Sequence, residues 1–150
     1  MSALDEFLQM GQTIIIGSHR FEAEEIKTFA RKFDPQPFHL DEEAARNSVF
    51  GGLCASGWHT VAVWMQVNLR HVAAAGERPW KGDGPPPAFG PSPGFRKLRW
   101  LKPVYAGSTL TYSRRAMQMR AHTARPGWNI LTTLCEAHDQ TGDKVLEFES

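Results

Sequence analysis

The sequence predicts an α+β fold, in which a curved antiparallel β-sheet wraps around a central apolar helix. Helix-like segments fill the first half of the chain and strand-like segments fill the second half. Such segregation favours an α+β arrangement over alternating β and α units with a parallel sheet. Between the two halves, residues 58–75 form the longest apolar helical segment, and its apolar residues extend beyond a single face. A helix of that kind is normally buried, so we expect it at the centre of the fold.

The first half of the chain predicts one strand and two helices, over residues 13–16, 21–33 and 41–46. The strand is a β-branched run that we expect to end at Gly17. The first helix shows apolar residues at spacings of three and four, and Pro35 and Pro37 should end it and exclude helix from the segment that they occupy. Asp41 is suited to cap the second helix.

The second half predicts four antiparallel strands near residues 95–100, 109–120, 128–139 and 144–148. A turn over 103–107 separates the first two strands. Residues 76–94 are rich in Pro and Gly and form a long loop, which is either a lid or dimer contact, or a surface excursion without a role. The basic residues from Arg96 to Arg125 are either a patch for a phosphorylated ligand or solvated strand charges.

Length and composition indicate one globular domain over residues 1–150. Hydrophobic residues make up 41% and charged residues 22%, and the formal net charge is +1. We therefore expect no nucleic-acid or membrane partner. The N-terminus is acidic, which differs from a signal peptide, and a cytoplasmic location follows as the expectation. Cys54 and Cys135 show no metal-ligand spacing, so no metal is expected.

The segment FDPQPFHLD, residues 33–41, carries the strongest chemical signal. Asp34 and His39 lie five residues apart on a backbone stiffened by two prolines. A carboxylate and an imidazole make a competent pair for moving protons near neutral pH. The alternative is structural: Asp34 caps a turn, and His39 packs against Phe38.

This segment resembles the signature of the MaoC-like dehydratases and R-specific enoyl-CoA hydratases. The matching positions are Asp34, Pro37, Phe38, His39, Asp41 and Ala45. Ser56 and Gly57 are placed like the small residues that precede the central helix of that family, and residues 98–110 are similar to its strand and Pro-Val turn.

The resemblance implies a hotdog fold, a homodimer or larger oligomer, and an acyl thioester of coenzyme A or acyl carrier protein as substrate, with no further cofactor. It implies that Asp34 and His39 add water across an enoyl double bond, or remove it, while the Gly57 N–H polarises the thioester carbonyl. Glycine would let the thioester approach the backbone, and the alternative is a tight helix–sheet contact. Gln36, Ser56 and Phe38 are the expected substrate-binding residues.

Three positions depart from the family pattern, namely Phe33, Gln36 and Met65. Met65 replaces a hydroxyl residue that orients the Asp in some relatives, and Thr60 is the candidate substitute. Two other functions remain open: a non-catalytic acyl-thioester-binding protein and an acyl-CoA thioesterase. Residues 58–75 lack the acidic residue that many hotdog thioesterases place on this helix. His59 could face the cleft or be a neutral histidine packed in the helix.

Overall fold

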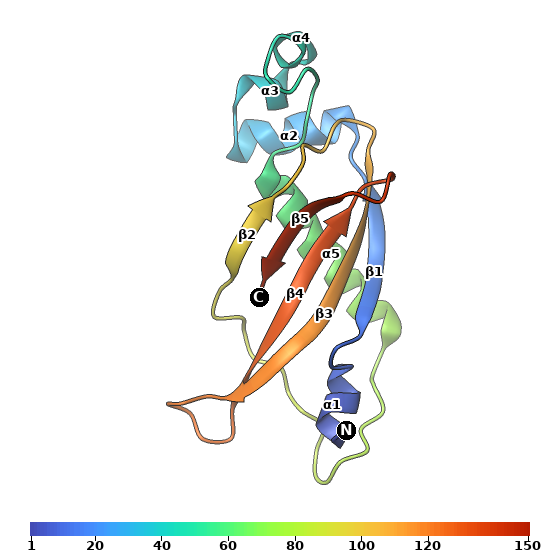
Figure 1. Ribbon diagram of the computed structural model, residues 1–150, viewed down its shortest axis with the longest axis vertical. Coiled ribbons are helices and arrows are strands. Elements are labelled where there is room, and N and C mark those ends of the chain that lie inside the picture. Colours follow the sequence, from blue (N-terminus) through green and yellow to red (C-terminus); the bar gives the residue numbers. More distant parts are fainter.

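The computed structural model describes residues 1–150 and contains one five-stranded antiparallel sheet with a long helix, α5 (Gly57–Ala75), along one face (Figure 1). The strand order is β1-β3-β4-β5-β2. The strands are β1 (Thr13–Arg20), β2 (Arg96–Trp100), β3 (Thr109–Ala121), β4 (Asn129–His138) and β5 (Lys144–Glu149). The predicted sheet around a central helix is confirmed, and none of the helices is long and apolar enough to cross a membrane.

Four short helices accompany α5, namely α1 (Ala3–Leu8), α2 (Ala23–Phe33), α3 (Pro37–Leu40) and α4 (Glu42–Arg46). Helices α2 to α4 gather at one end of α5, and α1 lies at the other end (Figure 1). The prediction that the prolines exclude helix is wrong at Pro37, because this residue begins α3. Proline is tolerated at the first helical position, where its missing N–H would have had no partner. Asp41 caps α4 as predicted, accepting from Ala44 N at 2.8 Å.

Strand β1 does not end at Gly17, as the sequence suggested, but continues to Arg20. The register with β3 shifts between Ile15 and Gly17, so Ile16 is the extra residue of a β-bulge and Gly17 resumes the pairing, opposite Tyr112. Gly17 has a φ of +145°, and a Cβ there would lie 2.8 Å from Val67 Cγ1 of α5. The glycine therefore marks the point where the strand crosses closely over the central helix.

Two hydrogen bonds and an apolar core fix α5 against the sheet. Trp64 Nε1 donates to Ser113 O at 3.0 Å, and Tyr112 Oη donates to Thr60 O at 3.0 Å. The largest buried apolar side chains of the core include Phe21, Ile26, Tyr112, Leu110 and Leu146. Helix α5 is thus held in one rotation about its axis, which fixes the direction of its N-terminal residues.

The expectation that α5 is buried on most sides is wrong for one stripe. Trp58, Met65, Leu69 and Val72 are between 45% and 58% exposed. They recur at spacings of seven, four and three, which places them on one face of the helix. A single sheet covers only the opposite face, so this stripe lies open in one chain.

The long loop over residues 76–94 packs against α1. Phe7 contacts Trp80 edge-on at a centroid distance of 5.6 Å and stacks with Phe89 at 6.5 Å. Arg78 donates to Phe7 O at 2.8 Å. Because α1 and α2 lie at opposite ends of α5, the loop is no lid over residues 33–41 of the same chain (Figure 1).

Candidate active site

Asp34 and His39 meet at the junction between α2 and α3. Asp34 is the C-cap of α2, and its N–H donates to Ala30 O at 2.9 Å, while His39 lies on α3. The His39 Nε2 atom lies 3.3 Å from Asp34 Oδ2, and the two side chains are only 7% and 16% exposed. The structure therefore brings the two predicted residues together in a mostly dehydrated position.

The backbone carbonyl of Cys54 determines how the His39 ring is used. His39 Nδ1 lies 2.6 Å from Cys54 O, and a carbonyl oxygen can only accept a hydrogen bond. Nδ1 must therefore carry a hydrogen, which leaves Nε2 of the neutral ring as a lone-pair acceptor facing the Asp34 carboxylate. Two acceptors at this distance are stable only if they share one proton or a bound water.

Gln36 supplies the hydrogen bond that orients Asp34. Its Nε2 donates to Asp34 Oδ1 at 2.7 Å, so the other carboxylate oxygen is left for His39. From the sequence, Thr60 was a candidate to orient Asp34. Its hydroxyl donates to Gly57 O at 2.6 Å instead, so it does not take this role. Met65 lies on the exposed stripe of α5.

Phe38 holds the His39 ring from the side. The two rings meet edge-on at a centroid distance of 4.6 Å, and Phe38 also contacts Phe50 edge-on at 4.8 Å. The packing contact proposed as the structural alternative therefore exists, and it exists together with the ion-pair contact to Asp34.

The thiol nearest to this pair is not suited to nucleophilic attack. Cys54 Sγ lies 3.8 Å from His39 Nδ1, but that nitrogen already donates to a carbonyl. Burial, and secondarily the Asp34 charge, raises the pKa of the Cys54 thiol to about 11. The thiol is protonated at neutral pH, so the site points to acid–base chemistry.

The N-terminus of α5 faces the same end of the molecule. Ser56 is its N-cap, is fully buried, and has a hydroxyl with no hydrogen-bond partner. Gly57 is the first helical residue, and the N–H groups at the start of a helix have no acceptor within it. The N–H groups of His59 and Thr60 donate to Ser56 O, so those of Gly57 and Trp58 are the donors available to a ligand.

Packing against β2 also requires glycine at position 57. A Cβ there would lie 2.3 Å from Cε2 of the Trp100 indole on β2. Trp100 also meets Trp58 edge-on at a centroid distance of 5.1 Å. The tight helix–sheet contact considered as an alternative is therefore present, and it leaves the Gly57 N–H, at the helix end, unpaired.

The basic residues on and after β2 are paired with acids of the sheet. Arg96 bonds Glu149, Arg99 bonds Glu147, and Lys102 bonds Asp139 and Asp143. The strand-charge interpretation accounts for these four pairs. No group of three His, Cys, Asp or Glu side chains is arranged to hold a metal ion.

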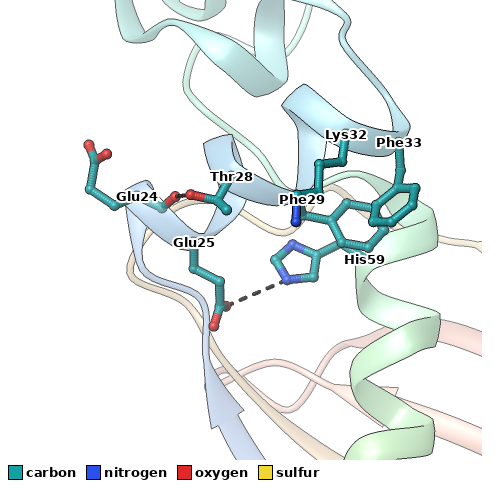
Figure 2. Close-up of a pocket in the computed structure, with 7 residues that line it drawn as sticks. All are labelled: Glu24, Glu25, Thr28, Phe29, Lys32, Phe33 and His59. Atoms are coloured by element: carbon teal, nitrogen blue, oxygen red, sulfur yellow. Dashed lines mark hydrogen bonds and ion pairs between the residues drawn. The ribbon is translucent and has the colours of Figure 1, made fainter.

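The sequence did not reveal a second polar cluster, formed by Glu25, His19 and His59; Figure 2 shows Glu25 and His59. Glu25 Oε1 lies 2.7 Å from His19 Nε2 and 3.7 Å from His59 Nε2. The ring of His59 stacks on Phe29 at 4.5 Å. The three polar residues come from β1, α2 and α5, so no sequence spacing could have predicted that they lie together.

Acidification should destabilise the protein through His59. Burial lowers the pKa of His59 to about 4 from an ordinary value of 6.5, against an opposing attraction from Glu25. Between these pH values the unfolded chain binds more protons, so stability falls as the pH drops from about 6.5 to about 4. In urea unfolding of the wild type, the unfolding free energy should fall by about 2 kcal/mol through this residue over that pH range. The unfolding free energy of His59→Phe should fall by correspondingly less. Equal pH slopes for both proteins would refute the assignment.

Comparison with known proteins identifies a family and a fold. Residues 9–128 match the model of a family described as the MaoC like domain. The Bacillus subtilis (strain 168) protein YdeM, described as uncharacterized, is 30% identical over 146 residues, which cover 97% of this chain and 94% of YdeM. The crystal structure of a MaoC-like dehydratase from Rhodospirillum rubrum is 38% identical, with a TM-score of 0.77 over 95% of this chain and 90% of that one. An (R)-hydratase from A. caviae involved in PHA biosynthesis shares the fold, with 22% identity and a TM-score of 0.64 over 93% of each chain.

Proposed function

The chain belongs to the MaoC-like family of hotdog proteins, and from this premise we propose that it hydrates trans-2-enoyl thioesters to 3-hydroxyacyl thioesters, or catalyses the reverse dehydration. The observation that carries the proposal is the 3.3 Å approach of His39 Nε2 to Asp34 Oδ2, with Nδ1 of the same ring bonded to Cys54 O. This arrangement leaves one nitrogen and one carboxylate oxygen to handle a single proton.

In the proposed reaction, the pair removes a proton from a water molecule, whose oxygen forms a bond to C3 of the enoyl group. The C2=C3 electron pair moves toward the thioester carbonyl, and C2 then receives a proton from the same pair. Atoms and charge balance without a metal or a redox cofactor, and coenzyme A or acyl carrier protein enters as part of the substrate. Such acid–base catalysis contributes about 10²- to 10⁴-fold in rate.

The negative charge that develops on the thioester oxygen needs a donor. The Gly57 N–H lies at the positive end of α5, a 19-residue helix, and we assign it this role. The buried Ser56 hydroxyl has no partner in the protein, which makes it a second candidate contact for the substrate. Gln36 and Phe38 contact Asp34 and His39, so they would act by positioning the pair.

A direct assay tests the proposal. Purified protein is given crotonyl-CoA and longer enoyl-CoAs, while the ultraviolet absorbance of the conjugated thioester and the release of free thiol are followed. Loss of absorbance without free thiol is the expected result. Release of thiol would indicate thioester hydrolysis instead, and binding without either change would indicate a non-catalytic acyl-thioester-binding protein.

We also propose that two or more copies of the chain associate through the exposed stripe of α5 and the open edge of strand β2. Strand β2 pairs only with β5, so its other edge is open. The stripe of Trp58, Met65, Leu69 and Val72 lies on the one face of α5 that the sheet does not cover. A second copy would cover the stripe and the open edge of β2. A contiguous exposed apolar stripe of this kind commonly marks a protein–protein contact.

Placing a charge in the stripe should shift the protein toward monomers. Leu69 is 58% exposed in one chain, so Leu69→Glu should fold normally yet weaken association by about tenfold or more, because a carboxylate would be desolvated at the interface. Sedimentation velocity over a concentration series measures this shift. Val49→Glu is a matched control, since Val49 is 93% exposed and lies outside the stripe. A monomeric wild type would contradict the proposal.

A further inference from the structure

An open pocket lies between α2 and the first turn of α5 (Figure 2). It has a volume of about 440 Å³, and its exposed lining surface is mostly apolar. Two of its seven lining residues are phenylalanines, and the other five carry polar groups: Glu24, Glu25, Thr28, Lys32 and His59. Ligand pockets commonly combine apolar surface with a few polar groups that determine specificity.

The pocket adjoins the proposed chemistry on both of its walls. Phe33 on the α2 wall precedes Asp34, and His59 on the α5 wall lies two residues after Gly57. Under the proposed function, we assign this pocket to the acyl group of the thioester, because its walls are continuous along the chain with Asp34 and Gly57.

His59 brings an unsatisfied acceptor to the pocket. The residue is 5% exposed, and its Nδ1 atom has no hydrogen-bond partner. Its Nε2 lies 3.7 Å from the Glu25 carboxylate, too far for a hydrogen bond, but the negative charge favours the tautomer with the hydrogen on Nε2, which leaves Nδ1 as a lone-pair acceptor. Burial also keeps this ring neutral at pH 7, because it lowers the pKa of His59 to about 4. A buried acceptor without a donor is costly, and a bound donor would remove that cost.

We propose that this pocket selects an acyl group bearing a neutral hydroxyl, which donates its hydrogen bond to His59 Nδ1. The inference deepens the proposed function and rests on it. An acyl carboxylate fits poorly, because two acidic side chains, Glu24 and Glu25, line the space against one lysine, Lys32, and the acceptor nitrogen repels an anion. An unsubstituted acyl chain would leave Nδ1 unsatisfied.

The test compares two substrates that differ by one hydroxyl, 4-hydroxycrotonyl-CoA and crotonyl-CoA. The wild type should show a higher kcat/KM for the hydroxylated thioester, by about tenfold, which is the usual value of one hydrogen bond to an otherwise unsatisfied group. His59→Phe keeps the ring that stacks on Phe29 and removes both nitrogens, so it should abolish the preference. His59→Asn can place an amide oxygen near the Nδ1 position and should retain part of it.

Matched controls separate the possible failures. His71→Phe is the same change at the far end of α5, about 18 Å along the axis, and should leave the ratio of the two kcat/KM values unchanged. Turnover of crotonyl-CoA by the wild type without any preference for the hydroxylated substrate overturns the inference alone. A loss in His59→Phe that is equal for both substrates also overturns it, because the ring would then contact the common pantetheine arm. Absence of turnover with either thioester would instead refute the proposed function.

Discussion

Replacement of His39 by Ala should lower kcat for enoyl-thioester hydration by about 10²- to 10⁴-fold, the range that a positioned acid–base group contributes. Asp34→Asn should cause a loss in the same range, because its amide keeps the shape of the carboxylate but cannot take a proton. The reason lies in the 3.3 Å contact between the two side chains, which makes them act on one proton as a unit. The double variant should therefore be little worse than either single variant.

The measurement is single-turnover and steady-state hydration of crotonyl-CoA, with the unfolding free energy recorded for every variant. Asp34→Asn can retain the hydrogen bond from Gln36, so its fold should be unaffected. His39→Ala removes the donor to Cys54 O and should cost about 1 to 3 kcal/mol of stability. His122→Ala is the matched histidine control, because that residue lies in the loop between β3 and β4. Turnover within a few-fold of wild type in either active-site variant would refute the mechanism.

Removing the backbone N–H at position 57 should lower kcat by about 100-fold, the effect of losing one oxyanion donor. The change requires a pair of variants, because any side chain at Gly57 meets the Trp100 indole. We therefore compare Gly57→Ala with Gly57→Pro, both in a Trp100→Ala background. The two proteins differ mainly in the N–H that proline lacks.

The helix should accept this proline. Position 57 is the first residue of α5, where proline is favourable, and Ser56 has φ of −56° and ψ of 138°, a conformation that suits a residue before proline. Gly57→Ala alone should cost about 1 to 3 kcal/mol through overpacking against the indole, and Trp100→Ala should relieve that cost. Equal kcat values for the two proteins with Trp100→Ala would exclude the Gly57 N–H as the donor.

The sheet and the pairing of Asp34 with His39 could be predicted because both depend on local signals. Strand-like segments separated by turn residues marked β3 to β5, and the order of helices and strands indicated their layering. The short segment between Asp34 and His39 limits how far apart the two side chains can be. The family resemblance then selected these residues from among six histidines.

The errors have physical causes that are not local. Pro37 was interpreted as a helix breaker, although at the first position of α3 it is a helix starter. Gly17 was interpreted as the end of a strand. Its actual role, to let β1 pass close to Val67 of α5, depends on tertiary packing that the local sequence does not show. Helix α1 was missed, although Ser2 and Asp5 form a capping box that could have indicated it. The burial of α5 was overestimated because apolar residues for a partner surface and for a core have the same composition.

The functional details that sequence reasoning missed all join distant elements. The contact of Glu25 with His19 and His59 joins three elements. The Trp100 indole over Gly57 spans 43 positions of the chain. Contacts of this kind depend on how the elements pack, and the residue types alone do not encode them.

The backbone around Cys54 ties the candidate site to the cooperative folding unit of the protein. Cys54 N donates to Phe38 O at 3.3 Å, while Ala55 N donates to Val104 O at 2.8 Å and Ala106 N donates to Leu53 O at 3.0 Å. The carbonyl that orients His39 is thus joined, one residue away, to the turn that leads into β3. The imidazole cannot be released by fraying of a surface loop, so heat should abolish the proposed hydratase activity and melt the sheet in a single transition.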